Sequence, residues 1–440
     1  METSQILEQA ERDEIKFISL QFADLLGVIK EVVVPKGRLN EILTSGAWFD
    51  GSSIEGFARI QESDLFLKPD ISTYAVVPWL TENGKTARFI CDIYRPDGTP
   101  FEDDPRQILK KTLSEAESLG YSFNTGPEPE FYLFKKDFTS KTVPVDQGGY
   151  FDLSSYDGYA IMKEIMTALK SFNINPETSH HEVGQGQYEI DFQYGPALQT
   201  ADRVLTMKYV IKQIAQRHGL IATFMPKPIM NIAGSGMHVH QSLFKDETNL
   251  FFDGTDKYGM SALAKSFIAG QLKNIPAMCA VLCPTVNSYK RLVSGFEAPV
   301  YITWAGMNRS ALIRIPRWFK ENPKAARAEL RCPDPTTNPY LAFALMLASG
   351  LDGIKNNLIP PEPVEENVYQ LDTNRLNDKN IKLLPTSLLE ALGEMEKNEM
   401  IKKTLGEHLF VKYLDIKKQE WDEFKTQVTA WESEKYLTAY

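Results

Sequence analysis

Residues 126–134 read Gly126-Pro127-Glu128-Pro129-Glu130-Phe131-Tyr132-Leu133-Phe134, and the rest of the chain is best interpreted from this stretch. The aromatic run at its end, bounded by Gly and Pro, is typical of a β-strand. Because side chains alternate along a strand, Glu128 and Glu130 should face the same way. Two adjacent carboxylates on an apolar strand repel each other and need a cation, which a hard divalent ion supplies. An edge strand with solvated glutamates is the alternative, and Pro129, which lacks an N–H, would suit it.

Composition sets the class of protein. The chain has 440 residues, enough for two or three domains, with 43% hydrophobic and 24% charged residues, as in ordinary globular proteins. A net charge of −10 and the lack of Lys/Arg runs argue against a nucleic-acid ligand. No secretory signal is visible, and the longest apolar tract, Leu341 to Ala348, is too short to span a bilayer. We therefore expect a cytoplasmic protein with no membrane partner.

The four cysteines, Cys91, Cys279, Cys283 and Cys332, are too few and too scattered for a disulfide framework. Cys279 and Cys283 are four residues apart in an apolar helical pattern. Buried free thiols are favoured there over a zinc site.

The N-terminal region is expected to form a small α+β unit. An opening helix precedes alternating strands at 16–22 and 28–34, which form a hairpin, and a further strand is expected at 86–93. The polar, Gly-rich loop 49–56 is a candidate functional loop. The turn-rich segment 95–105 ends in Pro105, which can begin a helix over 106–119. We predict the domain boundary here, giving domains 1–103 and 104–440.

Two further patterns add metal-binding side chains. Residues 178–192 predict two short strands around a Gly-bearing turn, which would bring Glu182 and Glu189 to one side. Helices are expected over 155–172 and 200–218. His238 and His240 are two residues apart on an extended segment behind a glycine-rich approach, so both should face one way and contact a ligand.

Basic residues then concentrate over residues 290–331. They are Lys290, Arg291, Arg309, Arg314, Arg317, Lys324, Arg327 and Arg331. Guanidinium groups on half-buried strands need anions such as phosphate or carboxylate. Carboxylates for metal and arginines for phosphate within one domain favour nucleotide-dependent phosphoryl transfer, although no P-loop or dinucleotide fingerprint is present. The C-terminal third is expected to be helical, and its aromatic tail, 421–440, favours packing on another subunit.

Taken together, these stretches resemble type I glutamine synthetase over essentially the whole chain. The motifs that carry the resemblance are Phe49-Asp50-Gly51-Ser52-Ser53, Pro127-Glu128-Pro129-Glu130, His181-Glu182-Val183, Gly186-Gln187-Tyr188-Glu189, Met225-Pro226-Lys227-Pro228, Gly234-Ser235-Gly236-Met237-His238, Asn287-Ser288-Tyr289-Lys290-Arg291-Leu292, Asn308-Arg309-Ser310 and Glu329-Leu330-Arg331. The resemblance implies an α+β chain with an N-terminal β-grasp domain. A large catalytic domain with a curved antiparallel sheet and surrounding helices would follow.

The resemblance also implies ATP-dependent ligation of ammonia to L-glutamate through γ-glutamyl phosphate, with two or more Mg²⁺ or Mn²⁺ ions per site. Glu130, Glu182 and Glu189 would hold one ion. Glu128, His238 and Glu329 would hold the second. Residues implied to bind ATP or phosphate are His240, Ser242, Arg309, Arg314, Lys324 and Arg327. Residues implied to bind glutamate or ammonium are Ser53, Tyr150, Gly234, Arg291 and Arg331.

Two residues are implied to serve the chemistry directly, together with Arg309. Asp50 would bind ammonium and take its proton, acting in the neighbouring subunit's site. Glu297 would lie on a flap that shields the acyl phosphate from water. The assembly implied is a homo-dodecamer of two stacked hexameric rings, with the C-terminal helix inserted into the opposite ring.

Regulation is inferred from the α division of the family. Residues 356–361 lack the tyrosine modified in the adenylylated division, and Arg59 matches the residue that couples glutamine feedback. We therefore expect feedback inhibition by glutamine, with a nitrogen-regulatory protein partner that is GlnR-like or PII-like. Two departures from the family pattern are Ala233, where Asn is common, and the less polar segment 304–307.

Two other functions stay open at the level of sequence. One is a ligase that joins glutamate to an organic amine such as a polyamine or ethanolamine, for which Ala233 would leave room. The other is a non-catalytic glutamine sensor that regulates a transcription factor. All six implied metal ligands are present, which a pure sensor would not need.

Overall fold

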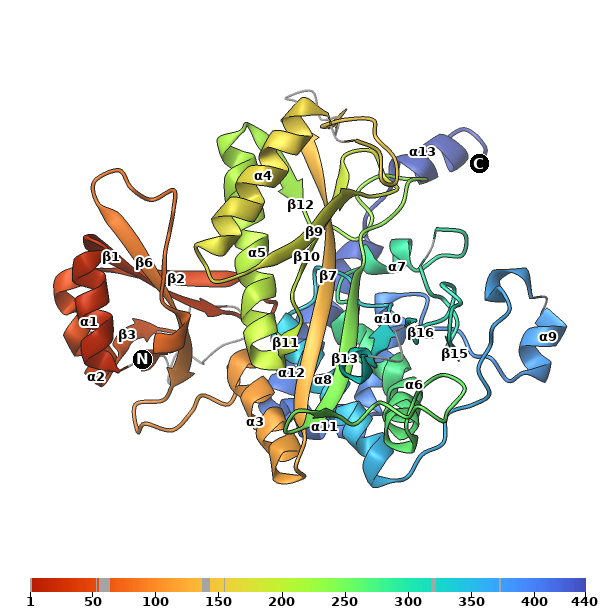
Figure 1. Ribbon diagram of the computed structural model, residues 1–440. Coiled ribbons are helices and arrows are strands. Elements are labelled where there is room, and N and C mark those ends of the chain that lie inside the picture. Colours follow the sequence, from red (N-terminus) through yellow and green to blue (C-terminus); the bar gives the residue numbers. More distant parts are fainter. Residues whose placement is uncertain are drawn as a thin grey trace.

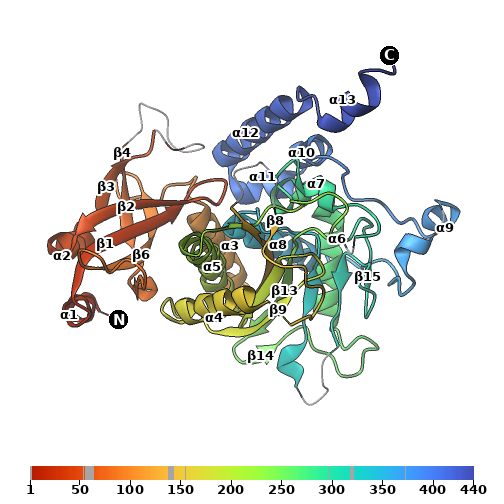
Figure 2. The same cartoon turned by 90° about the horizontal axis from the view of Figure 1, so that it is seen from above.

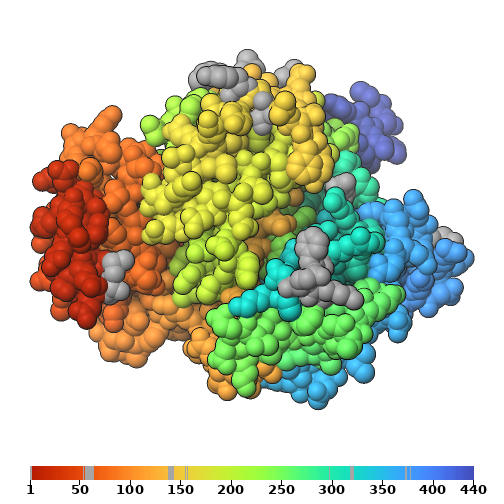
Figure 3. Space-filling model, viewed as in Figure 1, coloured from red at the N-terminus to blue at the C-terminus, as the bar shows by residue number. Residues whose placement is uncertain are grey.

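A computed structural model describes residues 2–52, 54, 64–136, 143–153, 155–296, 298–317, 322–371 and 373–440. The chain forms two lobes (Figure 1), a smaller N-terminal one in red to orange and a larger one that contains the remaining elements. The space-filling view shows the two lobes packed directly against each other (Figure 3). Each lobe has its own sheet and buried apolar cluster.

The N-terminal lobe is a six-stranded sheet in which five strands follow the order β2-β1-β6-β4-β3 and β5 pairs with β6. Its elements are α1 (Thr3–Arg12), β1 (Ile15–Ala23), β2 (Ile29–Pro35), α2 (Leu39–Ser45), β3 (Ala47–Asp50), β4 (Asp64–Pro69), β5 (Ala75–Val76) and β6 (Lys85–Tyr94). The β1–β2 hairpin is antiparallel, and β1 runs parallel to β6. The predicted strands at 16–22, 28–34 and 86–93 and their hairpin are confirmed.

The larger lobe is built on an eleven-stranded sheet with the central order β15-β16-β17-β13-β7-β10-β9. Its strands are β7 (Ser122–Lys135), β8 (Val143–Pro144), β9 (Pro176–His181), β10 (Gln187–Phe192), β11 (Gly195–Pro196), β12 (Leu220–Thr223), β13 (Met237–Lys245), β14 (Thr248–Asn249), β15 (Trp304–Ala305), β16 (Ile313–Arg314) and β17 (Ala328–Leu330). The strand predicted from residues 126–134 lies within β7, and the predicted 178–192 hairpin is β9–β10. This mixed architecture confirms the expected fold class.

The edge-strand alternative for Pro129 is wrong, because β7 lies between β13 and β10. The N–H of Glu130 donates to the Gly236 carbonyl on the β13 side at 3.0 Å. Alternation along the strand therefore turns the nitrogens of Pro127 and Pro129 to the other side. On that side the pairing with β11 stops at Thr125, and the pairing with β10 begins only at Glu130. Both prolines thus occupy an interval where no ladder bond is lost.

Helices cover the sheet and form the rest of the larger lobe. They are α3 (Pro105–Ser118), α4 (Tyr156–Lys170), α5 (Ala197–Arg217), α6 (Ala262–Leu282), α7 (Ser288–Arg291), α8 (Pro339–Lys355), α9 (Thr373–Asp378), α10 (Leu388–Glu396), α11 (Glu399–Leu405), α12 (Glu407–Lys425) and α13 (Ala430–Tyr436). The axes of α6 and α8 approach closely at Gly270, where an added Cβ would lie 2.1 Å from the Ser349 carbonyl oxygen. The expected helices are present, although α5 begins three residues before the predicted Thr200.

A buried arginine on α3 joins the two lobes. Arg106 pairs with Asp70 and Asp92 of the N-terminal lobe, each at 2.7 Å, and with Asp202 of α5 at 2.9 Å. Asp104 caps the helix by accepting from the Arg106 N–H at 2.9 Å. A buried guanidinium needs anionic partners, so this cluster fixes the orientation of the lobes. The boundary between residues 103 and 104 stays a prediction.

The chain ends in helices that project from the larger lobe (Figure 2). Val428, Trp431 and Leu437 are exposed along the tail. Within the described ranges, no helix has both the length and the apolar character needed to cross a bilayer.

Candidate active site

The carboxylates of β7 face two histidines of β13. Glu128 lies opposite His238 in the strand register, and its Oε1 is 2.7 Å from His240 Nε2. His238 Nδ1 is 3.9 Å from Glu128 Oε2 and 3.6 Å from Glu329 Oε1 on β17. The structure therefore brings together Glu128, His238 and Glu329, which the sequence placed around one ion. His240 also lies close enough to Glu128 and Glu329 to share a metal with them.

The second predicted group gathers around β10. Glu189 lies opposite Glu130 in the β7–β10 register. His180 bridges the group, with Nδ1 3.3 Å from Glu182 Oε1 and Nε2 3.3 Å from Glu189 Oε1. His180, Glu189 and Asp191 form a further potential metal-binding set. Neither His180 nor Asp191 was assigned a role from the sequence, although the alternation of β9 and β10 could have indicated both.

Burial raises the free energy of the ionised form of these carboxylates when no cation is bound. It raises the pKa of Glu130 to about 7, despite nearby Arg291. Burial, followed by the charge of Glu130, holds the pKa of Glu189 well above its usual range. Burial and Arg331 lower the pKa of His238, which keeps its imidazole neutral and able to ligate. Carboxylate oxygens with a neutral imidazole suit a hard divalent ion, so the residues present fit the metal expected from the sequence.

Two buried arginines lie beside this carboxylate face. Arg291, at the end of α7, donates from Nη1 to the Cys332 carbonyl at 2.8 Å and from Nη2 to the Arg331 carbonyl at 3.1 Å. Arg331 contacts Glu329 through Nε at 3.3 Å. Its buried Nη1 has no hydrogen-bond partner among the described residues. An unsatisfied buried guanidinium donor needs an acceptor, and a substrate carboxylate would provide one.

A glycine-rich segment lets the backbone approach these groups. A Cβ on Gly234 would lie 2.5 Å from the Pro226 carbonyl oxygen, and one on Gly236 would lie 2.5 Å from Arg291 Nη2. Gln187 Nε2 donates to the Gly234 carbonyl at 3.1 Å and to Glu130 at 2.9 Å. Only glycine fits at these two positions, and the amide of Gln187 ties the segment to the carboxylate group.

A cavity of about 220 Å³ opens next to His240. Its lining includes Tyr194, Ser242, Lys324 and Arg327. Arg327 Nε donates to His240 Nδ1 at 3.1 Å, and Lys324 Nζ is 2.6 Å from Glu247. Cationic side chains with a hydroxyl and an aromatic ring are suited to a nucleotide. Arg314, predicted with this group, instead forms a short ion pair with Glu329.

Of the residues predicted to bind ammonium, Asp50 lies in the N-terminal lobe, whereas Tyr150 lies beside the metal-binding side chains. Asp50 is exposed at the end of β3, which lies apart from β7 and β13 (Figure 1). It accepts from the Ser52 N–H at 2.8 Å and the Ser52 hydroxyl at 2.6 Å, and these bonds lower its pKa. Tyr150 hydrogen-bonds Arg309, and its ring lies 5.9 Å from that of His180. The predicted Ser53, Arg59 and Glu297 lie outside the described residues.

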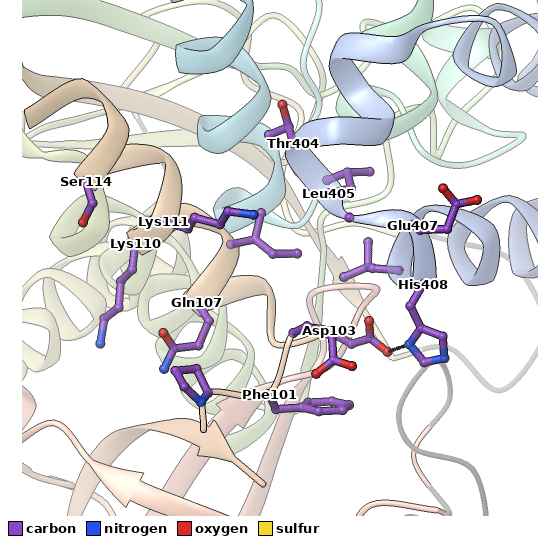
Figure 4. A pocket seen from close by; sticks show the side chains of 15 residues that line it. Phe101, Asp103, Gln107, Lys110, Lys111, Ser114, Thr404, Leu405, Glu407 and His408 are labelled. Carbon is purple, nitrogen blue, oxygen red and sulfur yellow. Dashed lines mark ion pairs between the residues drawn. The ribbon is translucent and has the colours of Figure 1, made fainter. Parts of the chain in front are cut away.

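A separate cavity of about 490 Å³ lies between α3 and the start of α12 (Figure 4). Asp103 and His408 form an ion pair at its wall, and Lys412 also contacts Asp103 at 3.1 Å. None of the predicted site residues lines it. The chemistry is therefore expected on the sheet face and not in this cavity.

Carboxylates that need a cation and a guanidinium that needs an anion share one face of the larger sheet. This combination defines a metal-dependent enzyme that acts on anionic substrates. Comparison with protein families gives the particular assignment. Residues 14–96 match the family described as glutamine synthetase, beta-Grasp domain, and residues 102–436 match glutamine synthetase, catalytic domain.

Relatives match over nearly the full length. A glutamine synthetase of Clostridium saccharobutylicum is 50% identical over 99% of this chain and 98% of its own. One from Staphylococcus aureus is 49% identical, covering 98% and 97% respectively. Among solved structures, a GmaS/ADP complex is 33% identical with a TM-score of 0.88, covering 98% of this chain and 99% of its own. Plasmodium falciparum glutamine synthetase is 27% identical with a TM-score of 0.89, covering 99% of both chains. The chain belongs to the glutamine synthetase family.

Proposed function

We propose that the sheet face of this chain ligates ammonia to L-glutamate, with ATP as co-substrate. The chain belongs to the glutamine synthetase family and is 50% identical to the Clostridium saccharobutylicum enzyme over 99% of its length. This similarity makes it an ATP-dependent glutamate–ammonia ligase. The observation that carries the residue assignments is the gathering of Glu128, Glu130, Glu189 and His238 beside the unsatisfied Nη1 of Arg331.

The metal ligands are proposed to form two sets. Glu130, Glu182 and Glu189 form one, and Glu128, His238 and Glu329 form the other. Mg²⁺ or Mn²⁺ bound there would neutralise the charge of the phosphates and of the carboxylate substrate. His180, in contact with both Glu182 and Glu189, would hold these side chains toward the first set.

Glutamate is proposed to bind against Arg291, Arg331 and the backbone at Gly234. An oxygen of its γ-carboxylate attacks the γ-phosphorus of ATP, and ADP departs. Ammonia then attacks the acyl carbon, and phosphate leaves with the glutamate oxygen that made the first bond. Because positioning and charge neutralisation carry most of such a transfer, the arginines act by fixing the substrate and screening its charge.

The nucleotide is proposed to occupy the cavity beside His240. His240, Ser242, Lys324 and Arg327 line it, and Arg309 and Arg314 would contact the transferred phosphoryl group. A GmaS structure solved as an ADP complex shares the fold, with a TM-score of 0.88, and supports nucleotide binding by a chain of this fold.

Ammonium is proposed to bind at Asp50 from a neighbouring subunit, with Tyr150 and Ser53 nearby. The separation of β3 from β7 within one chain supports a contribution across an interface. Glu297 would close over the acyl phosphate. The oligomer proposed is a dodecamer of two hexameric rings, and the exposed apolar residues of the C-terminal tail support its use in ring-to-ring contact.

Regulation is proposed to act through glutamine, with Arg59 coupling its binding to activity and a nitrogen-regulatory protein as partner. Adenylylation is not expected.

The experiment is phosphate release from ATP with Mg²⁺ and glutamate, with and without ammonium, and with glutamine added. We expect ammonium-dependent release that glutamine inhibits. Asp50→Asn should lose the ammonium dependence. Asp97→Asn is the matched control, because Asp97 is also exposed and accepts from Thr99 N–H at 2.9 Å and hydroxyl at 2.6 Å, as Asp50 does from Ser52. Equal activity of the two variants would contradict the role of Asp50.

Mixed oligomers test the interface contribution. Asp50→Asn and Glu189→Gln chains, each inactive alone, should regain activity when co-expressed, because a Glu189→Gln neighbour supplies Asp50 to an intact metal site. No recovery in mixed oligomers would place Asp50 in the site of its own chain.

A further inference from the structure

Three cysteines meet in the core of the larger lobe. Cys279 lies on α6, Cys283 directly follows that helix, and Cys332 follows β17. Their sulfur atoms all lie within 4.8 Å of one another, and none of the three residues is exposed. All three are free thiols. The sequence indicated only the first two as neighbours, and the fold adds the third from 49 residues beyond Cys283.

The spacing of the sulfurs is that of a metal site. Each of the three sulfurs lies within 4.8 Å of the other two, so they form a compact triangle. A zinc–sulfur bond is about 2.3 Å, which puts sulfurs around one ion about 4 Å apart. The observed separations of at most 4.8 Å are close to this value.

The backbone around the cluster is tied together by hydrogen bonds. The Cys283 thiol contacts the Cys332 carbonyl at 3.2 Å, and the N–H of Asp334 donates to the Leu282 carbonyl at 3.1 Å. These hydrogen bonds hold the segment after β17 against the end of α6.

The surrounding charges suit an anionic complex. A divalent ion with three thiolates carries one net negative charge, since binding releases the thiol protons. Arg291 donates to the Cys332 carbonyl at 2.8 Å, and the structure gives it no carboxylate partner within the described residues. The buried guanidinium therefore offsets the charge of the complex.

We propose that Cys279, Cys283 and Cys332 bind one thiophilic d¹⁰ metal ion, Zn²⁺ or Cu⁺, which ties the end of α6 to the segment after β17. Soft thiolate donors favour these two ions over Mg²⁺. The site stands apart from the proposed carboxylate sites, and metal binding there does not depend on the proposed function. A metal bound there would affect catalysis by positioning two arginines. Arg291 is held by the carbonyl of Cys332, and Arg331 directly precedes Cys332 in the chain.

The test is the metal content of the full chain, purified under reducing conditions and washed with EDTA to remove ions held by carboxylates. Elemental mass spectrometry should find one zinc or copper ion per chain, and the element found distinguishes the two ions. Cys279→Ala/Cys332→Ala should lose it. Cys91→Ala, which removes the buried cysteine of the N-terminal lobe, and Glu189→Gln, which removes a carboxylate ligand, should keep it.

If the double variant does not fold, a spectroscopic measurement on the wild-type chain tests whether the three cysteines bind a metal ion. Co²⁺ taken up in place of zinc should give thiolate-to-cobalt charge-transfer absorption, and this signal should persist in Glu189→Gln. A chain that retains no zinc or copper and gives no such absorption would overturn the proposal and leave three core thiols.

Discussion

Replacing Glu130 with Gln should stabilise the metal-free chain and weaken its response to Mg²⁺, because one of the two proposed metal sites loses a ligand. Glu130 Oε2 accepts both hydrogen bonds, from Gln187 Nε2 at 2.9 Å and from the Gly236 N–H at 3.0 Å. The single carbonyl oxygen of a glutamine can therefore keep both. Burial raises the pKa of Glu130 from 4.5 to about 7. Ionising such a carboxyl group costs about 3 kcal/mol, which the uncharged amide avoids.

The sign of the pH dependence follows from the raised pKa. Below about pH 4.5 the wild-type carboxyl is protonated in both folded and unfolded chains, so the two proteins should be equally stable. As the pH rises toward the folded-state pKa of about 7, ionisation favours the unfolded wild-type chain. The variant's advantage in free energy of unfolding should grow over this window to about 3 kcal/mol and then level off.

The assay is unfolding in a chelating buffer across this pH range, repeated with Mg²⁺ in excess. Wild type should gain stability with Mg²⁺, and Glu130→Gln should gain less, because only the proposed site of Glu128, His238 and Glu329 stays intact. Glu115→Gln, at an exposed position on α3, is the matched control and should behave as wild type. A Glu130→Gln chain that is no more stable than wild type above neutral pH, or whose advantage does not depend on pH, would refute the reasoning.

Two other substitutions and one truncation test separate parts of the account. Gly234→Ala puts a Cβ 2.5 Å from the Pro226 carbonyl, so steady-state kinetics should show the KM for glutamate raised roughly 5- to 150-fold, in line with an overpacking cost of about 1–3 kcal/mol; an unchanged KM would contradict the close approach. Arg331→Lys loses the forked guanidinium donor. The kcat/KM for glutamate should therefore fall roughly 10- to 100-fold, because a charged hydrogen bond worth about 1.5–3 kcal/mol is lost. Wild-type kinetics would show that Arg331 does not contact the substrate. A chain ending at Thr426, without α13, should sediment as single hexameric rings, and an intact dodecamer would exclude the tail from ring contact.

Local patterns predicted the features that depend on strand periodicity. Alternation alone placed Glu128 with Glu130 and His238 with His240, and the register of β7 with β13 then brought these pairs together. The sheet order could not be obtained this way, because it depends on pairing between distant segments. Pro129 illustrates this, since its fit within a central strand depends on where β11 stops and β10 begins.

Contacts between distant segments could not be predicted from local sequence patterns either. The three-cysteine cluster needs Cys332 beside α6, and the inter-lobe cluster needs Asp202 of α5 beside Arg106. Such neighbours are set by the packing of whole elements, which no local pattern encodes. His180 lies within the hairpin predicted over residues 178–192, but its bridging position between Glu182 and Glu189 appears only once β9 and β10 are paired.

The central claim is that glutamate is activated by transfer of a phosphoryl group to its γ-carboxylate on this sheet face. The most direct measurement uses glutamate labelled with a heavy oxygen isotope in the γ-carboxylate, together with ATP, Mg²⁺ and ammonium, and follows the label by mass spectrometry of the released phosphate. The account predicts one labelled oxygen in each phosphate released, in step with glutamine formation. Phosphate that carries no label while glutamine forms would contradict it.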